Sequence, residues 1–389
     1  MAVAAGSKNN DEFVFFFREH PEDSDHYFCS QWYVKDIEYK GRVYKSAEHL
    51  MMFYKAVFFK DYAVAEKILA CNTPREAKDL GRQVSNYVDP DWLAVNKRVI
   101  SLGTKEKFLQ DHESLERLLY TNGRVLVEAS PFDDLYGIKL RADDPKAKNP
   151  FLWLGQNLLG EVITKFRDDA LSGRLWETVD LTNPVYARAK GVVDAYLAHT
   201  PFQKTVYQVR GDLLKAFENK EVDVLIHSCH CFNYMGVGFA QKVANLFPEA
   251  DMADRQTLKG DVNKLGTYSV ARLEDGGVIV NAYAQYGYGK DGARADEVLN
   301  NEHDVKGRDP DRPHVSYDCL RKILTNVNRE FKGQRVGLPT IGADLGRSDW
   351  NMIKSIIRET LVDVDVTIFY YHEVMMKKRF NKGHGFGLG

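Results

Sequence analysis

The first half of the chain combines a few short apolar runs with long stretches of helical spacing. Two of the predicted helices begin at recognisable caps: Ser46 precedes one of them, and Thr73 followed by Pro74 opens another. The pattern predicts helices over 47–59, 74–81, 90–110, 113–120 and 154–171, strands over 13–17 and 124–130, and a hairpin over 35–44. We therefore expect a helix-rich α+β domain over residues 12–175.

The second half alternates strands and helices, which is typical of a three-layer α/β/α sandwich. The predicted strands span 205–209, 222–228, 267–273, 278–283, 335–338 and 364–371, and the helices 212–217, 240–247, 314–331 and 349–361. We expect this second domain over 205–372. A weaker pattern over 176–204 predicts a linker, which could contain a helix. Residues 1–11 are expected to be disordered and 373–389 to form a flexible basic, glycine-rich tail.

The composition narrows the classes of protein that remain. The chain has 389 residues, 44% of them hydrophobic, and a net charge of −2, which excludes a broadly basic nucleic-acid coat but not a local basic groove. Five scattered cysteines do not form a disulfide framework, and Cys229-His230-Cys231 lacks the further ligands of a zinc site, so we expect no metal. No apolar run suits a signal peptide or a membrane span, which favours a cytoplasmic or nuclear protein without a membrane partner.

Glycine loops follow several predicted strands of the second half. Gly236 and Gly238 stand between a buried strand and a helix, where a backbone without side chains can approach a ligand and the helix offers unpaired N–H groups. A second such loop covers 337–347 and ends in a basic residue, Arg347. Two loops of this kind could bind a diphosphate, although a lone Gly-x-Gly is also common as a plain tight turn.

Several motifs of the second half look like those of a macrodomain of the type that processes ADP-ribose-1''-phosphate. They are Val-Arg-Gly-Asp at 209–212, His-Ser-Cys-His-Cys at 227–231, Gly-Val-Gly-Phe-Ala at 236–240, Asn-Ala-Tyr-Ala-Gln at 281–285, and Leu-Pro-Thr-Ile-Gly-Ala at 338–343. The resemblance implies ADP-ribose binding by Asp212, His227, Asn233, Gly236, Val237, Gly238, Phe239, Gln285, Gly342, Ala343, Leu345, Gly346 and Arg347. Asp212 could equally be a helix N-cap, and His227 a packed histidine of a strand end.

In the first half, Glu48, Met52 and Lys55 fall on one face of a predicted helix, because offsets of four and seven recur after whole turns. A carboxylate and a lysine directed into a pocket suit cleavage of an N-glycosidic bond: the carboxylate stabilises an oxocarbenium-like state, and the lysine protonates the leaving group or attacks the anomeric carbon. From the residues alone, Glu48 could equally be an ordinary acid of an early helical turn, and Lys55 a surface lysine.

The first half also carries motifs that resemble the NADAR family, named for NAD and ADP-ribose. They include Ser-Gln-Trp at 30–32, Lys-Ser-Ala-Glu-His at 45–49, Gly-Arg at 81–82, Leu-Val-Glu at 126–128, Asp-Leu-Tyr-Gly at 134–137 and Gly-Gln-Asn at 155–157. The resemblance implies Glu48, Lys55, Glu128 and Asp134 as catalytic residues, and Trp32, Arg82, Tyr136, Gly137 and Asn157 as residues that line the site. It also permits a Schiff base between Lys55 and ring-opened ribose.

Both resemblances imply the same ligand, which leads to one main hypothesis. An N-glycosidase would cleave ADP-ribose from guanine, in a nucleic acid or a nucleotide, and the second domain would bind or process ADP-ribose, with no cofactor required. Two alternatives stay open: an N-glycosidase of riboflavin-pathway or NAD-related metabolites, and a protein that binds ADP-ribose without turnover. The sequence indicates no particular protein partner.

Overall fold

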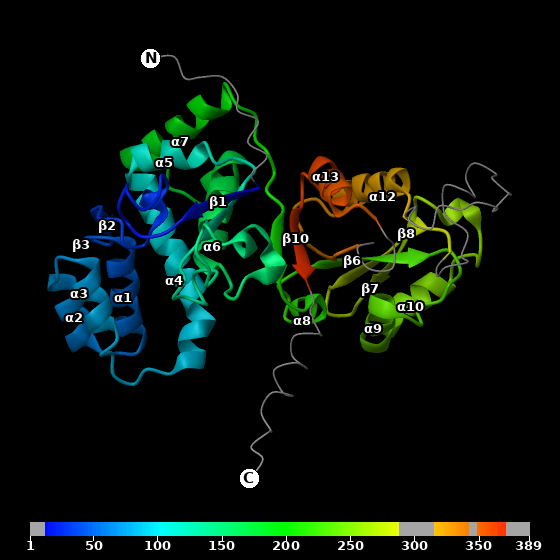
Figure 1. The fold of residues 1–389 in the computed structure, drawn as a ribbon, viewed down its shortest axis with the longest axis horizontal. Helices are drawn as coiled ribbons and strands as arrows, with labels where there is room; N and C mark the ends of the chain where they lie inside the picture. Colours follow the sequence, from blue (N-terminus) through cyan, green and yellow to red (C-terminus); the bar gives the residue numbers. More distant parts are fainter. Residues whose placement is uncertain (1–11, 288–314, 342–347, 371–389) are drawn as a thin grey trace, which may run out of the picture. The chain divides into compact units, whose positions relative to one another are not determined.

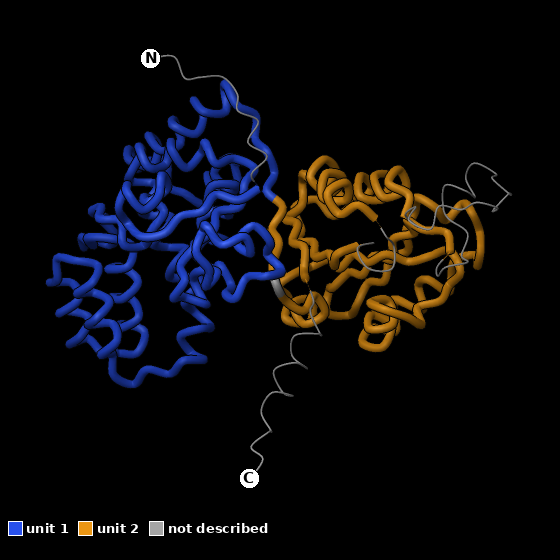
Figure 2. The backbone as a smooth tube through the Cα atoms, in the orientation of Figure 1, with its two compact units in different colours: residues 1–205 blue, residues 206–389 orange. Residues whose placement is uncertain are grey.

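The structure is a computed structural model that describes residues 12–287, 315–341 and 348–370 (Figure 1). The expected disordered start, 1–11, and the expected tail, 373–389, lie outside these described residues. The chain divides into two compact units, residues 1–205 and 206–389 (Figure 2). Because each unit has its own hydrophobic clusters, each is described by itself.

Helices make up most of the first unit. Its α-helices are α1 (Ala47–Phe58), α2 (Tyr62–Ala70), α3 (Pro74–Gly81), α4 (Asp89–Gln110), α5 (His112–Leu119), α6 (Leu158–Leu171) and α7 (Pro184–Leu197). Short 3₁₀ helices are η1 (Tyr27–Cys29), η2 (Pro145–Lys148), η3 (Pro150–Leu152) and η4 (Arg174–Glu177). Strands β1 (Phe13–Phe16) and β4 (Val125–Glu128) pair in parallel, and β2 (Ile37–Tyr39) and β3 (Arg42–Tyr44) form an antiparallel hairpin. This arrangement agrees with the α+β class that we expected.

Local sequence signals explain where two of these helices begin. The Ser46 side chain accepts a hydrogen bond from the His49 N–H and so caps α1. At α3, Thr73 and Glu76 form a reciprocal capping box, and Pro74 occupies the first turn, where its missing N–H costs nothing. Both helix starts confirm the sequence prediction, and both matter for the site because α1 and α3 supply side chains to it.

Three features of the first unit differ from the prediction. Helix α2 was not predicted, because its apolar stripe is short. Helix α6 begins at Leu158 rather than at residue 154, because Asn157 before it has a left-handed backbone with φ of 57°. The segment expected as a linker contains α7, in which Ala189 and Val193 are fully buried in the core of this unit. Most of that segment therefore belongs to the first unit.

A six-stranded sheet forms the centre of the second unit, in the order β5-β10-β9-β6-β8-β7. Neighbouring strands are parallel except for the antiparallel pair β7 and β8. The strands are β5 (Tyr207–Arg210), β6 (Val224–His230), β7 (Tyr268–Arg272), β8 (Val278–Gln285), β9 (Arg335–Pro339) and β10 (Asp365–Tyr370). The helices are α8 (Leu213–Glu218), α9 (Gly238–Leu246), α10 (Pro248–Arg255), α12 (Tyr317–Glu330), α13 (Trp350–Thr360) and the 3₁₀ helix η5 (Val262–Lys264); α10 was not predicted.

Helices cover both faces of this sheet. In β6, Val224 and Ile226 pack in one hydrophobic cluster with residues of α12 and α13, whereas Leu225 between them packs in another with residues of α8, α9 and α10. The alternation follows from the period of two in a strand. Figure 1 shows α12 and α13 on one side of the sheet and α8, α9 and α10 on the other. The expected three-layer α/β/α architecture is therefore present in the described residues.

A helix must be long and apolar to span a membrane. Within residues 12–287, 315–341 and 348–370, no helix combines the length and the apolar character needed to span a bilayer.

Candidate active site

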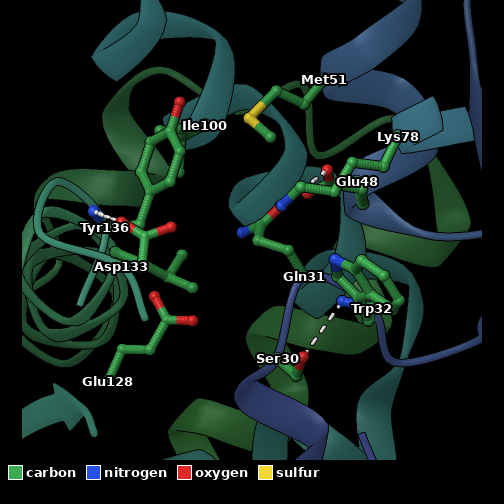
Figure 3. Close-up of a pocket in the computed structure, with 11 residues that line it drawn as sticks. Ser30, Gln31, Trp32, Glu48, Met51, Lys78, Ile100, Glu128, Asp133 and Tyr136 are labelled. Carbon is green, nitrogen blue, oxygen red and sulfur yellow. Dashed lines mark hydrogen bonds and ion pairs between the residues drawn. The ribbon is translucent and has the colours of Figure 1, made fainter. Parts of the chain in front are cut away.

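A small cavity in the first unit brings together residues that are far apart in the sequence. Its volume is about 40 Å³, enough for a water molecule but not for a nucleoside. The lining residues are Ser30, Gln31, Trp32, Glu48, Met51, Lys78, Ile100, Glu128, Asp133, Tyr136 and Leu159. Figure 3 shows Glu128, Asp133 and Tyr136 on one side of the cavity, Trp32, Glu48 and Lys78 on the other, and Gln31 between them.

Glu48 lies in the first turn of α1 and is only 2% exposed. Its backbone N–H donates to the Gln31 carbonyl at 2.9 Å, which ties α1 to the loop before it. Burial raises the pKa of the Glu48 carboxyl, and Lys78, whose Nζ lies 3.6 Å from Oε1, opposes this rise. Among the described residues, Oε1 has no hydrogen-bond partner. The Glu48 carboxyl is therefore buried and ion-paired with Lys78 through Oε1, but this oxygen makes no hydrogen bond within the described residues.

Glu128 ends strand β4 on the opposite side of the cavity. Its N–H donates to Asn157 Oδ1 at 2.9 Å, and Asn157 Nδ2 donates to the Leu126 carbonyl at 3.0 Å, so Asn157 fixes the end of the strand. Burial raises the pKa of Glu128 to about 8, and the nearby Asp133 adds to the rise. Its Oε2 is enclosed and finds no hydrogen-bond partner in the described part of the chain. The carboxyl is therefore mostly protonated at neutral pH.

Two lysines accompany Glu48, and only one of them lines the cavity. Lys55 was expected in the site; its Nζ lies instead 4.2 Å from the centre of the Tyr87 ring, and burial lowers its pKa while Glu48 raises it. Lys78 on α3 was missed by the sequence reasoning, although it contacts the cavity and lies 5.5 Å from the Trp32 ring centre. No local signal identified it, because sequence neighbours on a helix do not share a face and the buried Ala77 says nothing about Lys78.

The structure places Asp133, not Asp134, in the cavity. Asp134 points to solvent: its side chain is 64% exposed and pairs with Lys139 at 2.8 Å. Asp133 lines the cavity, and its Oδ1 accepts from the N–H groups of Leu135 and Tyr136. The choice of Asp134 was therefore wrong in its placement, because two neighbouring residues of an irregular loop point in opposite directions and no periodicity tells them apart.

The remaining residues predicted for this site have different positions. Trp32 and Tyr136 line the cavity, and burial raises the pKa of the Tyr136 phenol to about 12, so it stays neutral. Gly137 does not line it; a Cβ there would come within 2.8 Å of the Glu128 carbonyl, so glycine allows close packing behind Glu128. Arg82 is also absent from the lining, since its exposed side chain pairs with Asp79 at 3.0 Å.

In the second unit, three residues expected to bind ADP-ribose are already bonded within the protein. Asp212 caps α8 by accepting from the N–H groups of Leu214 and Lys215. His227 is 1% exposed, its Nε2 lies 2.8 Å from Asn281 Oδ1, and burial lowers its pKa to about 4. Asn233 donates to the Thr257 carbonyl and accepts from Lys264. For Asp212 and His227, the structure agrees with the alternatives that the sequence left open.

Within the described residues of the second unit, the glycine loop after β6 has open space at Gly238. Gly238 begins α9 with φ of +62°, and a Cβ there meets nothing within 4 Å; Val237 before it provides no side-chain cap. Gly236 lies under the ring of Tyr234. Phe239 packs at the edge of the His227 ring, with centres 6.2 Å apart, and Gln285 ends β8. The predicted Gly342, Ala343, Leu345, Gly346 and Arg347 lie outside the described residues.

Comparison with known proteins matches the region that holds the cavity. The NADAR domain family matches residues 15–170. N-glycosidase R617 of Acanthamoeba polyphaga mimivirus is 35% identical over 164 residues, which cover 41% of this chain and 96% of the relative. N-glycosidase Npun_R5314 of Nostoc punctiforme is 34% identical over 101 residues, 26% of this chain and 65% of the relative. The solved macrodomain of Mycobacterium tuberculosis DarG aligns with 42% of this chain and 97% of its own at 22% identity and a TM-score of 0.30.

The identity to R617 along nearly its whole length decides the class of the first unit. The matched residues contain both cavity carboxyls, Glu48 and Glu128, and the relatives carry the name N-glycosidase. This chain is accordingly an enzyme of the hydrolase class, an N-glycosidase by its first unit. The resemblance predicted from its motifs is confirmed, and the chain belongs to the NADAR family.

Proposed function

We propose that the first unit hydrolyses the N-glycosidic bond between ADP-ribose and a nucleobase, guanine in particular, and that the second unit binds the ADP-ribose. The observation that carries the first part is the pair of carboxyls in one cavity, Glu48 and Glu128. Each has an enclosed oxygen without a hydrogen-bond partner among the described residues. Because buried polar atoms are normally paired, these oxygens are candidates for ligand contacts.

The different surroundings of the two carboxyls suggest different roles. Glu128 faces Asp133, and its raised pKa, about 8, keeps a proton on it at neutral pH. Burial raises the pKa of Glu48 as well, but Lys78, whose Nζ lies 3.6 Å from Oε1, opposes that rise and favours the ionised form. An acid and a base need different ionisation, and this ion pair is the feature that distinguishes Glu48 from Glu128. In our proposal Glu128 is the general acid and Glu48 the carboxylate.

Hydrolysis then follows a simple balance of atoms. The bond between the anomeric carbon and the base nitrogen breaks, and the leaving base takes the proton of Glu128. A water molecule attacks the anomeric carbon and gives its proton to Glu48, whose negative charge also stabilises the oxocarbenium-like state. The products are free ADP-ribose and the base without its ADP-ribose modification. Lys55 lies outside the lining residues, so this route needs no Schiff base.

The size of the cavity limits what can enter it. At about 40 Å³ it accommodates a water molecule, whereas ligand pockets commonly measure about 300–1,000 Å³. Gln31 lies between the two walls, so we propose that it moves aside when the sugar enters (Figure 3). The base can then stack on Trp32 at the edge of the cavity.

The second unit supports the ADP-ribose part of the proposal through its glycine loop. Gly238 leaves open space at the start of α9, and a helix start attracts anions through its free N–H groups. The loop follows the carboxyl end of β6, the edge at which open α/β sheets bind ligands. The motifs that resemble a macrodomain lie at the same place and imply the same ligand.

The turnover test uses the full chain and an oligonucleotide that carries ADP-ribose on guanine. Release of free ADP-ribose is followed by liquid chromatography. We expect wild-type turnover, a loss of about 10²–10⁴-fold in kcat for Glu128→Gln, and near wild-type rates for Asp134→Asn. The control is matched because Asp134 neighbours the cavity residue Asp133 but points to solvent.

Three outcomes would contradict the proposal or one of its parts. Equal rates for wild type and Glu128→Gln would remove Glu128 as the acid. Absence of ADP-ribose release, together with release of a base from a riboflavin-pathway or NAD-related metabolite, would replace the substrate. Binding of ADP-ribose with no product from either substrate would leave only the non-catalytic alternative.

Binding by the second unit is tested by calorimetry with ADP-ribose. Gly238→Glu adds a negative side chain to the loop, and we expect it to weaken this binding at least tenfold. Gly276→Glu is the matched control, because Gly276 also has a positive φ, +87°, and open space around its Cβ, but lies in the turn between β7 and β8. Equal weakening by both variants would mean that backbone strain, not the loop, explains the loss.

A further inference from the structure

A buried lysine lies behind the loop that forms one wall of the cavity. Lys107 on α4 is 0% exposed, and no carboxylate of the described chain lies within ion-pair distance of its Nζ. The ammonium donates instead to three successive backbone carbonyls: Phe28 at 3.0 Å, Cys29 at 3.2 Å and Ser30 at 3.1 Å. All three N–H donors of a protonated lysine are therefore used on one short stretch of backbone.

That stretch leads directly into the cavity wall. The next two residues, Gln31 and Trp32, line the cavity together with Ser30. The Gln31 carbonyl accepts the N–H of Glu48 at 2.9 Å, and the Trp32 N–H donates to Ser30 Oγ at 3.1 Å. The carbonyls of residues 28–30 thus point to Lys107 and the carbonyl of 31 points to α1. The direction of these carbonyls determines how Gln31 and Trp32 face the cavity.

We propose that Lys107 is a positioning residue of the active site: its ammonium holds residues 28–32 so that Gln31 and Trp32 face the substrate and Gln31 stays bonded to Glu48. Lys107 does not line the cavity, so it acts through the loop and not on the substrate. An apolar side chain at this position would leave the carbonyls of Phe28 and Cys29 without a donor, and that of Ser30 with only the Tyr33 N–H at 3.3 Å, which is why a buried charge is tolerated here. The consequence for turnover rests on the proposed function, whereas the consequence for the loop does not.

Lys107 is expected to lose its charge within a pH range in which the protein can be studied. Burial lowers its pKa to about 8, and Cys29 and Asp111 are the groups that raise it. Cys29 stays a neutral thiol, because burial raises its pKa to about 12, and Asp111 at the end of α4 pairs with Lys35 at 3.3 Å. From the other packed helices, Arg117 of α5 and Arg167 of α6 also face Cys29.

Deprotonation changes the number of donors at this point. A neutral amine has two N–H groups for three carbonyls, so one of the three hydrogen bonds from Lys107 is lost and the loop is held less firmly. This gives a readout that a purely structural lysine would not have: the environment of Trp32 should change with the charge of Lys107, while the fold persists.

The test is acrylamide quenching of Trp32 fluorescence in the full chain, obtained by subtracting the spectrum of the same protein with Trp32→Phe, since the chain has five tryptophans. We expect Lys107→Met to raise the quenching constant of Trp32 at least twofold and Lys107→Arg, which keeps the charge, to restore most of it. Lys105→Met is the matched control on the same helix and should leave quenching unchanged. A Trp32 signal in Lys107→Met equal to wild type would overturn the inference.

A second measurement covers the case in which Lys107→Met does not fold. In the wild-type protein, quenching of Trp32 measured from pH 7 to pH 10 should rise with a midpoint near 8, the pKa of Lys107. In Lys107→Arg the same titration should be flat. A flat wild-type titration would contradict the inference whether or not the enzyme turns over. With ADP-ribosylated guanine as substrate, Lys107→Met should lower kcat more than it raises KM.

Discussion

Two clusters of buried charged groups, one in each unit, differ in how completely the protein satisfies them. In the second unit, Lys264 lies 3.4 Å from Asp254, which in turn accepts from the Tyr283 hydroxyl at 2.7 Å, and all three side chains are almost fully buried. In the first unit, Glu48 and Glu128 each keep an enclosed oxygen for which the described residues offer no hydrogen bond. The first cluster is linked by hydrogen bonds within the protein, whereas in the cavity Glu48 has only the ion pair with Lys78, and both carboxyls retain an oxygen that makes no hydrogen bond with the described residues.

The comparison separates groups that stabilise a fold from groups available for chemistry. A closed polar network stabilises one arrangement because each member satisfies the next. An unpaired buried carboxyl costs stability and persists where a function needs it. In the second unit, His227 and Asn233 are hydrogen-bonded within the protein, and their contact with ADP-ribose stays a prediction.

The largest effect is expected when Glu48, a cavity carboxyl of the first unit, is neutralised, which tests whether it serves catalysis and not stability. Glu48→Gln removes the negative charge but keeps the volume, and we expect kcat to fall by about 10²–10⁴-fold, because the oxocarbenium-like state loses its counter-charge. The free energy of unfolding should stay the same or rise, since a desolvated charge is removed. Chromatographic turnover and urea unfolding measure the two quantities. A variant that loses stability but keeps its rate would reverse the assignment.

Removing a buried carboxylate of the second unit should have the opposite effect: it should lower stability and leave turnover unchanged. Asp254→Ala leaves the Lys264 ammonium buried without its carboxylate, and we expect a loss of about 3–5 kcal/mol in the stability of this unit. Glycosidase turnover at a temperature where the variant stays folded should be unchanged. Hydrogen exchange of strands β6 and β8 reports the stability of this unit separately. A loss below about 1 kcal/mol would mean that the network is not the stabilising element.

The pH dependence of the stability of the first unit tests the raised pKa of Glu128 in the folded protein. Burial raises the pKa of Glu128 in the folded protein from 4.5 to about 8, so between these values the folded state binds a proton that the unfolded state has released. Its contribution is complete below pH 4.5 and disappears as the pH rises toward 8. We expect the urea midpoint of the first unit to fall over this window, and to fall less in Glu128→Gln. Parallel curves for the two proteins would contradict the raised pKa.

The smallest effect is expected at the solvent-exposed acid beside the site. Asp134→Asn breaks a surface ion pair with Lys139, so we expect little or no change in the free energy of unfolding and a rate within about twofold of wild type. Asp133→Asn, one residue away, should lower the rate more strongly because Asp133 lines the cavity. Equal rates for these two variants would contradict the assignment of Asp133 to the active site and of Asp134 to the surface.

Local signals in the sequence were enough to predict much of the fold and the two carboxyls of the cavity. Ser46 and Thr73 cap helices as their residue types indicate, and Glu48 and Glu128 meet in one cavity as the motifs implied. The hairpin expected over 35–44 is present as β2 and β3, and its turn contains Gly41, whose φ is 70°. These features depend on neighbours within a few residues or on a motif, both of which a sequence displays.

Other features depend on packing between distant segments, which no local pattern displays. Lys78 and Lys107 read as ordinary helical lysines, yet one reaches Glu48 and the other reaches carbonyls 77 to 79 positions earlier in the chain. The choice between Asp133 and Asp134 depends on the path of an irregular loop. Asn157 was expected to line the site, but its two hydrogen bonds hold β4 from behind.

The measurement that tests the central claim most directly is the titration of the Glu128 side-chain carboxyl by carbon-13 NMR in the full chain, with the signal assigned from its absence in Glu128→Gln. The account predicts an apparent pKa near 8 that moves when the substrate's sugar occupies the cavity. A carboxyl that titrates near its ordinary value of 4.5 would leave the proposed reaction without its acid and would contradict the account.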